Sequence, residues 1–203
     1  KHPLKLLEEI TIEPVCVRNG MVNGFAFFIT VVTQNLYYVD KTMYIPQLEE
    51  EARFLFFTRP RRFGKSLFIN MLRAYYDSSK KKEFQTLFGN LWIGKHPTPL
   101  QGAFQVLYLD FSQVGGSIDV VEERFNEYCC ICLNDFMDSY GDAYPENMRR
   151  DFYESKSAGA KLAMLDKKAK AIGLPLYLII DEYDNFTNTI LNEKGEAVYH
   201  AIT

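Results

Sequence analysis

A basic segment in the first third of the chain carries the residue types that hold a phosphate group. It reads Thr-Arg-Pro-Arg-Arg-Phe-Gly-Lys-Ser-Leu over residues 58–67 and follows an apolar run. Gly64 would let the backbone approach a phosphate oxygen, the Lys65 ammonium would reach the β- and γ-phosphates, and the Ser66 hydroxyl would bind magnesium. The amides near Lys65 and Ser66 would open a helix whose N-terminus carries partial positive charge. The pattern therefore predicts a P-loop for ATP and Mg²⁺.

The predicted phosphate loop departs from the standard Gly-x4-Gly-Lys-Ser/Thr pattern at one position. Arg59 stands where the first glycine is expected, so the chemically central second half is what remains. The arginines have two interpretations, as extra charge against phosphates or as a solvated basic loop. The whole loop has a structural alternative as well, namely a basic connection between two core elements. The residues predicted to contact the nucleotide are Arg61, Arg62, Phe63, Gly64, Lys65, Ser66 and Leu67.

A second chemical pattern ends an apolar run late in the chain. Residues 176–180 are Leu-Tyr-Leu-Ile-Ile, and Asp181 and Glu182 follow at once. Carboxylates at the carboxyl end of a buried strand lie where α/β sheets place ligands. Asp181 is predicted to hold Mg²⁺ through water, and Glu182 to polarise the attacking water. The alternative is that both carboxylates simply end the strand at solvent. The prediction makes Lys65 and Glu182 catalytic, and Ser66 and Asp181 metal ligands.

Apolar periodicity predicts the elements that must position these residues. Runs rich in aromatic and β-branched residues predict strands, and apolar residues repeating near 3.6 predict helices. The predicted strands are 25–32, 37–40, 54–58, 104–111 and 176–180. The predicted helices are 44–52, 66–76, 121–140, and one or two over 145–171 that are interrupted near Gly159. Strands that alternate with helices favour a three-layer α/β domain with a parallel sheet.

Composition limits the class of protein. The 203 residues suffice for one domain with a sizeable core, and 47% are hydrophobic, which argues against disorder. A net charge of -3 gives no global attraction to nucleic acid. The apolar run at 25–32 is far too short to span a bilayer, and no signal-peptide pattern is present. We therefore expect a cytoplasmic protein without a membrane partner, whose four cysteines are reduced thiols.

Three segments together resemble a known family. Residues 37–42 (Tyr-Tyr-Val-Asp-Lys-Thr), 58–67 and 180–185 (Ile-Asp-Glu-Tyr-Asp-Asn) are similar to the bacterial AAA-ATPase-like family. The resemblance implies that Arg59 in place of glycine is the family's own Walker A form, and that Asp-Glu-Tyr-Asp is its Walker B segment. It implies nucleotide and magnesium roles for Lys65 and Ser66, a magnesium role for Asp181 and a catalytic role for Glu182.

The resemblance also implies an organisation for the chain. Residues 37–203 are expected to be the N-terminal part of a P-loop ATPase domain of the additional-strand, catalytic-glutamate class. Residues 1–36, which do not match the family's usual lead-in, form a separate segment of unassigned structure. Because the chain starts at Lys1 and family members continue past residue 203, we expect a fragment. The strand between 54–58 and 176–180 would then come from beyond Thr203. Members often continue into a nuclease-like domain of the PD-(D/E)xK type, through which nucleic acid would be a partner.

The two chemical patterns favour one function among three. The first is the binding and hydrolysis of MgATP by the motor or switch domain of a larger bacterial protein. The second is a nucleotide-dependent binding scaffold with little turnover, and the third is a module associated with nucleic acid. The presence of Glu182 favours the first over the second, and the acidic net charge weighs against the third. The sequence specifies no oligomeric state and no arginine finger.

Overall fold

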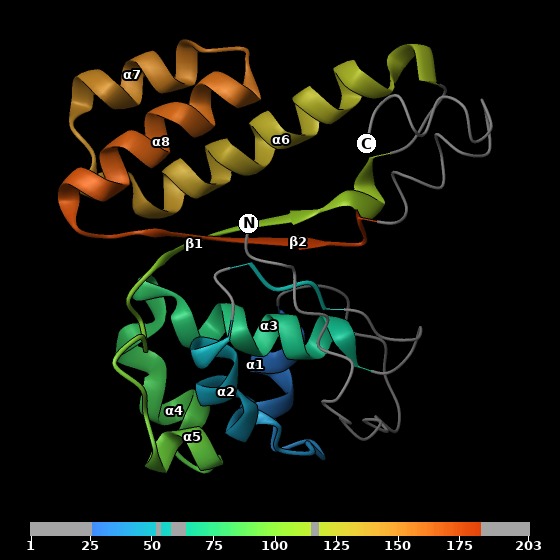
Figure 1. Cartoon of the computed structure of the whole chain (residues 1–203), viewed down its shortest axis with the longest axis vertical. Helices are drawn as coiled ribbons and strands as arrows, with labels where there is room; N and C mark the ends of the chain where they lie inside the picture. The colour runs from blue at the N-terminus through green and yellow to red at the C-terminus, as the bar shows by residue number, and fades with distance from the viewer. Residues whose placement is uncertain (1–25, 52–53, 58–63, 115–117, 184–203) are drawn as a thin grey trace. The chain divides into compact units, whose positions relative to one another are not determined.

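The structure is a computed structural model that describes residues 26–51, 54–57, 64–114 and 118–183. The chain divides into two compact units, Lys1–Ala103 and Phe104–Thr203. Figure 1 shows the elements of each unit. The boundary expected between residues 36 and 37 remains a prediction.

The described part of the first unit consists of helices joined by short connections. Three α-helices and two short ones are accompanied by two turns of 3₁₀-helix. They are α1 (Ala26–Thr33), η1 (Thr42–Tyr44), α2 (Ile45–Glu50), α3 (Lys65–Tyr76), η2 (Ser78–Glu83), α4 (Phe84–Phe88) and α5 (Trp92–Lys95). The helix predicted at 66–76 is confirmed as α3, and that predicted at 44–52 is confirmed as η1 and α2.

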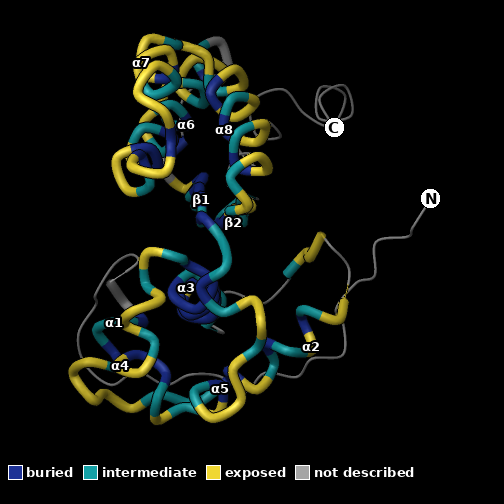
Figure 2. Tube along the Cα trace, turned by 90° about the vertical axis from the view of Figure 1, so that its left-hand side faces the viewer, coloured by how far each residue is buried: buried dark blue, intermediate teal, exposed yellow. Residues whose placement is uncertain are grey.

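Aromatic side chains form the core of the first unit. The ring of Phe28 in α1 lies 5.3 Å from that of Phe88 in α4, and Tyr75 of α3 meets Phe88 edge-on at 5.5 Å. All three side chains are fully buried. Most of α3 is buried as well, as its colour in Figure 2 shows. Aromatic pairs add a preferred geometry to the burial of apolar area, so this cluster fixes α3 against its neighbours.

Over its described residues, 26–32, the apolar run predicted as a strand at 25–32 is a helix, and that prediction is wrong there. Phe28 and Val31 are both buried in α1, and their spacing places them on one helical face. α1 packs on α3 and α4. A short apolar run does not distinguish strand from helix by periodicity, and tertiary packing overrides the β-propensity of Phe, Ile and Val.

Residues 37–40 also form no strand, because Asp40 caps two helical segments. Its Oδ1 accepts the backbone N–H of Thr42 at 2.8 Å and the Thr42 hydroxyl at 2.7 Å. Its Oδ2 accepts the N–H of Trp92, the first residue of α5, at 2.6 Å. The Thr42 hydroxyl oxygen in turn accepts the N–H of Ile93 at 3.1 Å. These bonds satisfy backbone donors at the starts of two helical segments. Residues 37–40 therefore connect η1 to α5 and do not pair with a described strand.

The apolar run before the phosphate loop is not a strand over its described residues, 54–57. Residue 58 of that prediction lies outside the described residues. A strand exists only when a neighbour completes its backbone hydrogen bonds, and here the sheet pairs only β1 with β2. Phe57 instead stacks on Phe68 of α3, with ring centroids 5.4 Å apart. The predicted strand is therefore wrong for residues 54–57.

The described part of the second unit contains a small parallel sheet and three α-helices. Its elements are β1 (Gln105–Asp110), η3 (Phe111–Gln113), α6 (Ile118–Tyr140), η4 (Gly141–Ala143), α7 (Glu146–Glu154), α8 (Ala158–Ile172) and β2 (Leu176–Asp181). The strands are parallel, with a register that runs from Gln105 opposite Leu176 to Asp110 opposite Asp181. These elements confirm the strands predicted at 104–111 and 176–180, and the helix predicted at 121–140.

The sequence predicts one or two helices over residues 145–171, and the structure has two, α7 and α8. The division falls at residues 155–157, just before Gly159. The Ser157 hydroxyl caps α8 by accepting the N–H of Ala160 at 3.3 Å. Gly173 ends α8 with a φ of 71°, a left-handed conformation that glycine adopts at little cost.

The core of the second unit lies between β1 and the helices. Leu107 and Leu109 of β1 are buried against Leu133 and Phe136 of α6, together with Leu165 of α8. The apolar residues of α6 thus form part of this core. On β2, Leu178 and Ile180 remain 48% and 42% exposed. The described residues therefore form a mixed α/β fold with a two-stranded parallel sheet, and the predicted three-layer arrangement is not established.

Candidate functional site

The described part of the predicted phosphate loop, from Gly64 onward, makes a sharp turn into α3. Gly64 precedes the helix with φ 78° and ψ 20°, the left-handed region that favours glycine. Its carbonyl oxygen accepts the N–H of Phe68 at 3.0 Å, so the helix hydrogen bonds begin at this residue. Lys65 is the first helical residue, and Ser66 is exposed. The predicted order of loop, Gly-Lys-Ser and helix is therefore present from Gly64 onward.

The first turn of α3 suits an anion and is anchored by buried side chains. It contains no acidic residue, and the N-terminus of an α-helix carries partial positive charge. Leu67 and Phe68 are buried, which fixes the turn against the core of the first unit. The buried Asn70 side chain donates from Nδ2 to the Ser66 carbonyl oxygen at 2.8 Å. Sequence analysis did not identify Asn70; its only signal was a polar residue within an otherwise apolar helical face.

Six residues of the predicted loop, 58–63, lie outside the described residues, and four of them are predicted to face the phosphates or the nucleotide. These four are Arg59, Arg61, Arg62 and Phe63. Their contacts with a nucleotide remain a prediction.

Asp181 lies at the carboxyl end of β2 and is only 3% exposed. Its Oδ1 accepts the N–H of Glu182 at 2.9 Å, and its Oδ2 accepts the hydroxyl of Tyr108 at 3.3 Å. A buried carboxylate needs hydrogen bonds or a positive partner to offset the loss of hydration. The burial of Asp181 disfavours the alternative in which the strand simply ends at solvent.

Glu182 has a backbone conformation that is rare for its residue type. Its φ is 51°, in the left-handed region that residues with a Cβ seldom occupy, and its side chain is half-buried. Such a conformation costs on the order of 1 kcal/mol and persists only where the surroundings determine it. At this turn the N–H of Glu182 donates to Oδ1 of the adjacent Asp181. This outlier coincides with the residue predicted to polarise water.

Asp110 ends β1 opposite Asp181, so both parallel strands end in an aspartate. Its Oδ1 accepts the N–H of Ser112 at 3.0 Å, and its own N–H donates to the Tyr128 hydroxyl oxygen at 2.8 Å. Burial is the largest cause of a raised pKa for Tyr128, so that hydroxyl is neutral at pH 7. Sequence analysis missed Asp110, although an apolar strand that ends in Asp repeats the pattern at 176–181.

The predicted site residues belong to different units. Gly64, Lys65, Ser66 and Leu67 lie in the first, whereas Asp181 and Glu182 lie in the second. Their assembly around one nucleotide remains a prediction. Within the described residues, no group of three or more His, Cys, Asp or Glu side chains could hold a metal ion by itself.

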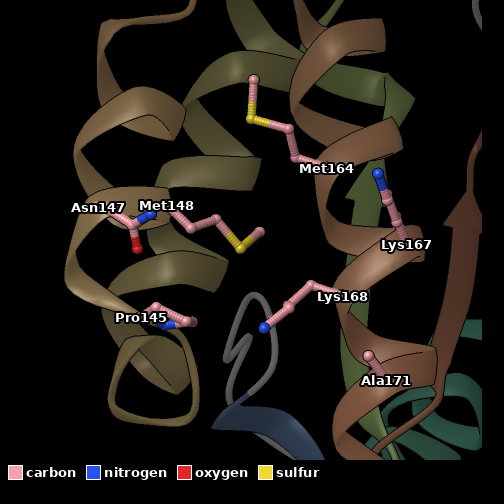
Figure 3. Close-up of a pocket in the computed structure, with 7 residues that line it drawn as sticks. All are labelled: Pro145, Asn147, Met148, Met164, Lys167, Lys168 and Ala171. Atoms are coloured by element: carbon pink, nitrogen blue, oxygen red, sulfur yellow. The ribbon is translucent and has the colours of Figure 1, made fainter.

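A separate pocket of about 370 Å³ lies within the second unit, between α7 and α8. Met148 and Lys168 extend into the space between the two helices (Figure 3). The full lining is Pro145, Asn147, Met148, Met164, Lys167, Lys168 and Ala171. It includes none of the predicted site residues.

Comparisons with known proteins identify a family. A family model described as "Predicted AAA-ATPase" matches residues 23–203. The "Uncharacterized protein in vnfD 5'region" of Azotobacter chroococcum mcd 1 is 40% identical over 68 aligned residues, which cover 30% of this chain. The match spans 12% of that relative's length. No solved structure matches the chain. Among the described helices, none is both long and apolar enough to cross a membrane.

Proposed function

Because the chain belongs to the Predicted AAA-ATPase family, we propose that it binds MgATP and hydrolyses it as the motor or switch domain of a larger protein. The observation that carries the proposal is the left-handed turn at Gly64, which leads directly into the N-terminus of α3. A helix N-terminus with a lysine and a serine in its first turn provides amide donors, a cation and a hydroxyl for a triphosphate.

The residues of the first unit take the phosphate-binding roles. Lys65 binds the β- and γ-phosphates, and the exposed Ser66 hydroxyl is a ligand of Mg²⁺. Arg61, Arg62, Phe63, Gly64 and Leu67 supply the rest of the cradle. Because Leu67 and Phe68 are buried, the first turn of α3 is held in place before the nucleotide arrives. Such positioning is most of what a protein contributes to phosphoryl transfer.

The residues of the second unit take the metal-binding and water-activating roles. A serine hydroxyl and an aspartate oxygen are the hard donors that Mg²⁺ prefers, so Ser66 and Asp181 fit that ion. When bound, Mg²⁺ neutralises charge on the phosphates. Asp181 holds its hydration shell, and Glu182 accepts a hydrogen bond from the attacking water and orients it. The left-handed turn at Glu182, directly after β2, supports a role for this carboxylate that is separate from the role of Asp181.

The test of the proposal is the loss of nucleotide binding on removal of one amine. Lys65→Ala in the intact protein removes a charge-assisted contact to phosphate, and we expect ATP affinity to fall by about 10-fold or more. Isothermal titration calorimetry measures this directly. Lys82→Ala, a change of the same type at an exposed residue of η2, is the matched control and should bind as the parent does. Equal ATP affinity in the parent and in Lys65→Ala would sink the P-loop assignment.

Turnover then separates the enzyme from a binding scaffold. A parent protein that binds MgATP and releases phosphate in many cycles is an ATPase. A parent that binds with the same dependence on Lys65 but releases no phosphate is a nucleotide-dependent scaffold, the second function that the sequence allowed.

A further inference from the structure

The Asp181 carboxylate is held at both oxygens. The backbone N–H of Glu182 donates to Oδ1 at 2.9 Å, and the Tyr108 hydroxyl donates to Oδ2 at 3.3 Å. Contacts to two different oxygens restrict rotation of the carboxylate about its Cβ–Cγ bond. Because Asp181 is 3% exposed, bulk water does not compete freely for these positions.

The register of the sheet explains why Tyr108 reaches Asp181. Tyr108 lies opposite Ile179, two residues before the Asp110–Asp181 pair. Side chains of register partners lie on one face and alternate along a strand, so Tyr108 and Asp181 share a face as diagonal neighbours. A tyrosine is long enough to span this diagonal. Asp110 lies directly opposite Asp181 in the register. Its Oδ1, however, accepts the N–H of Ser112, and this bond ties the Asp110 carboxylate to the turn that follows β1.

We propose that Tyr108 is a positioning residue for the metal-binding carboxylate, and that its hydroxyl fixes the orientation in which Asp181 meets the hydration shell of Mg²⁺. This inference rests on the proposed function, because it gives Asp181 a metal to bind. Side chains that hydrogen-bond to a metal-binding group orient that group, and their loss commonly weakens metal affinity or activity by 10- to 100-fold. The bond of 3.3 Å is longer than the usual hydroxyl–oxygen distance, so we expect about 10-fold, the lower end.

The test deletes single hydroxyl groups from the intact protein. Tyr108→Phe retains the aromatic ring in β1 and removes the hydroxyl that contacts Asp181. Tyr144→Phe is the matched control, since the Tyr144 hydroxyl donates to Gln105 at the opposite end of the same strand. We expect the Mg²⁺ concentration for half-maximal ATP turnover to rise about 10-fold in Tyr108→Phe and to stay at the parent value in Tyr144→Phe. ATP affinity without Mg²⁺ should be equal in all three proteins.

A double-mutant cycle asks whether Tyr108 acts through Asp181. Asp181→Asn should itself raise the Mg²⁺ requirement, and adding Tyr108→Phe to it should raise the requirement no further. For variants that turn over ATP too slowly to measure, the Mg²⁺ dependence of the affinity for a fluorescent ATP analogue replaces turnover as the measured quantity in the cycle.

The outcomes separate this inference from the proposed function. An unchanged Mg²⁺ requirement in Tyr108→Phe, including one accompanied by a lower melting temperature, would overturn the positioning role while leaving the ATPase intact. An equal effect of Tyr108→Phe with and without Asp181→Asn would overturn it as well. A parent protein without Mg²⁺-dependent binding or turnover of ATP would overturn the proposed function, and the inference with it.

Discussion

Glu182 is the residue at which backbone geometry and proposed chemistry coincide most closely. It follows a buried strand, and its φ of 51° turns the chain as soon as the strand ends. A straight continuation would place Asp181 and Glu182 on opposite faces of β2, as alternation along a strand requires. The left-handed turn gives Glu182 a different direction while its N–H still contacts Asp181. The backbone conformation of Glu182 is thus linked to the direction of its own side chain and to the hydrogen bond that holds Asp181.

Replacement of Glu182 by glutamine should separate binding from hydrolysis. Glu182→Gln retains the shape and the hydrogen-bonding capacity of the side chain but removes the base. We expect MgATP affinity close to that of the parent and a turnover rate lower by about 100-fold or more. Glu154→Gln, at the exposed end of α7, is the control and should leave both quantities unchanged. Phosphate release and calorimetry measure the two effects. Turnover at the parent rate would assign water activation to another residue.

At the scale of elements, the sequence predicted correctly the helices and strands whose apolar periodicity is strong and whose ends are marked by glycine, proline or polar residues. The helix that became α3 and the strands that became β1 and β2 have strong periodicity and clear punctuation, and the structure contains all three. The strand predicted at 25–32 is α1, because burial of Phe28 and Val31 against α3 and α4 decided between two patterns that a short run satisfies equally.

The candidate site also contains some residues that local sequence reveals and others that only tertiary packing reveals. Spacing identified Lys65, Ser66 and Asp181, because their roles depend on residues adjacent in sequence. Tyr108 and Asn70 were missed, because their contacts depend on strand register and on one turn of helix that the sequence does not display. The hydrogen bonds of these two residues arise from packing within each folded unit, and no sequence motif predicts them.

Lys161 on α8 shows how packing within a folded unit can bury a charged side chain. The side chain is 1% exposed, its Nζ donates to Asn134 Oδ1 at 2.7 Å, and it lies 4.5 Å from the centre of the Phe152 ring. The hydrogen bond and the aromatic face partly replace lost hydration. Burial nevertheless lowers the pKa of Lys161 below its ordinary value of 10.5.

The lowered pKa predicts a pH-dependent effect on stability. Because the unfolded chain binds the Lys161 proton more tightly than the folded chain, this residue's unfavourable contribution to folding grows as pH falls from 10.5 towards the lower folded pKa. Lys161→Met should therefore improve stability relative to the parent more at pH 7 than at pH 10. Urea denaturation at both pH values gives the difference. The control Lys167→Met, at an exposed position of the same helix, should show no such change. A difference between Lys161→Met and parent that is the same at both pH values would contradict the prediction.

At the scale of the whole molecule, the exposed apolar residues of β2 bear on the predicted sheet. Parallel sheets are normally covered on both faces, yet Leu178 and Ile180 remain partly exposed. The described residues alone therefore leave this face of β2 incompletely covered.

The proposed function requires both units to respond to one ligand. Lys65 lies in the first unit and Asp181 in the second, so a single MgATP bound by both residues would stabilise both units together. At a ligand concentration of 100 times Kd, the stabilisation is about 2.7 kcal/mol. Hydrogen exchange should then show MgATP-dependent protection in α3 and in β2 alike. Lys65→Ala should abolish it in both elements, whereas ATP with EDTA should protect α3 and leave β2 as in the free protein, because the contact of Asp181 runs through the metal. Protection of α3 by MgATP without any change in β2 would show that the carboxylates of the second unit do not serve the nucleotide bound by the first.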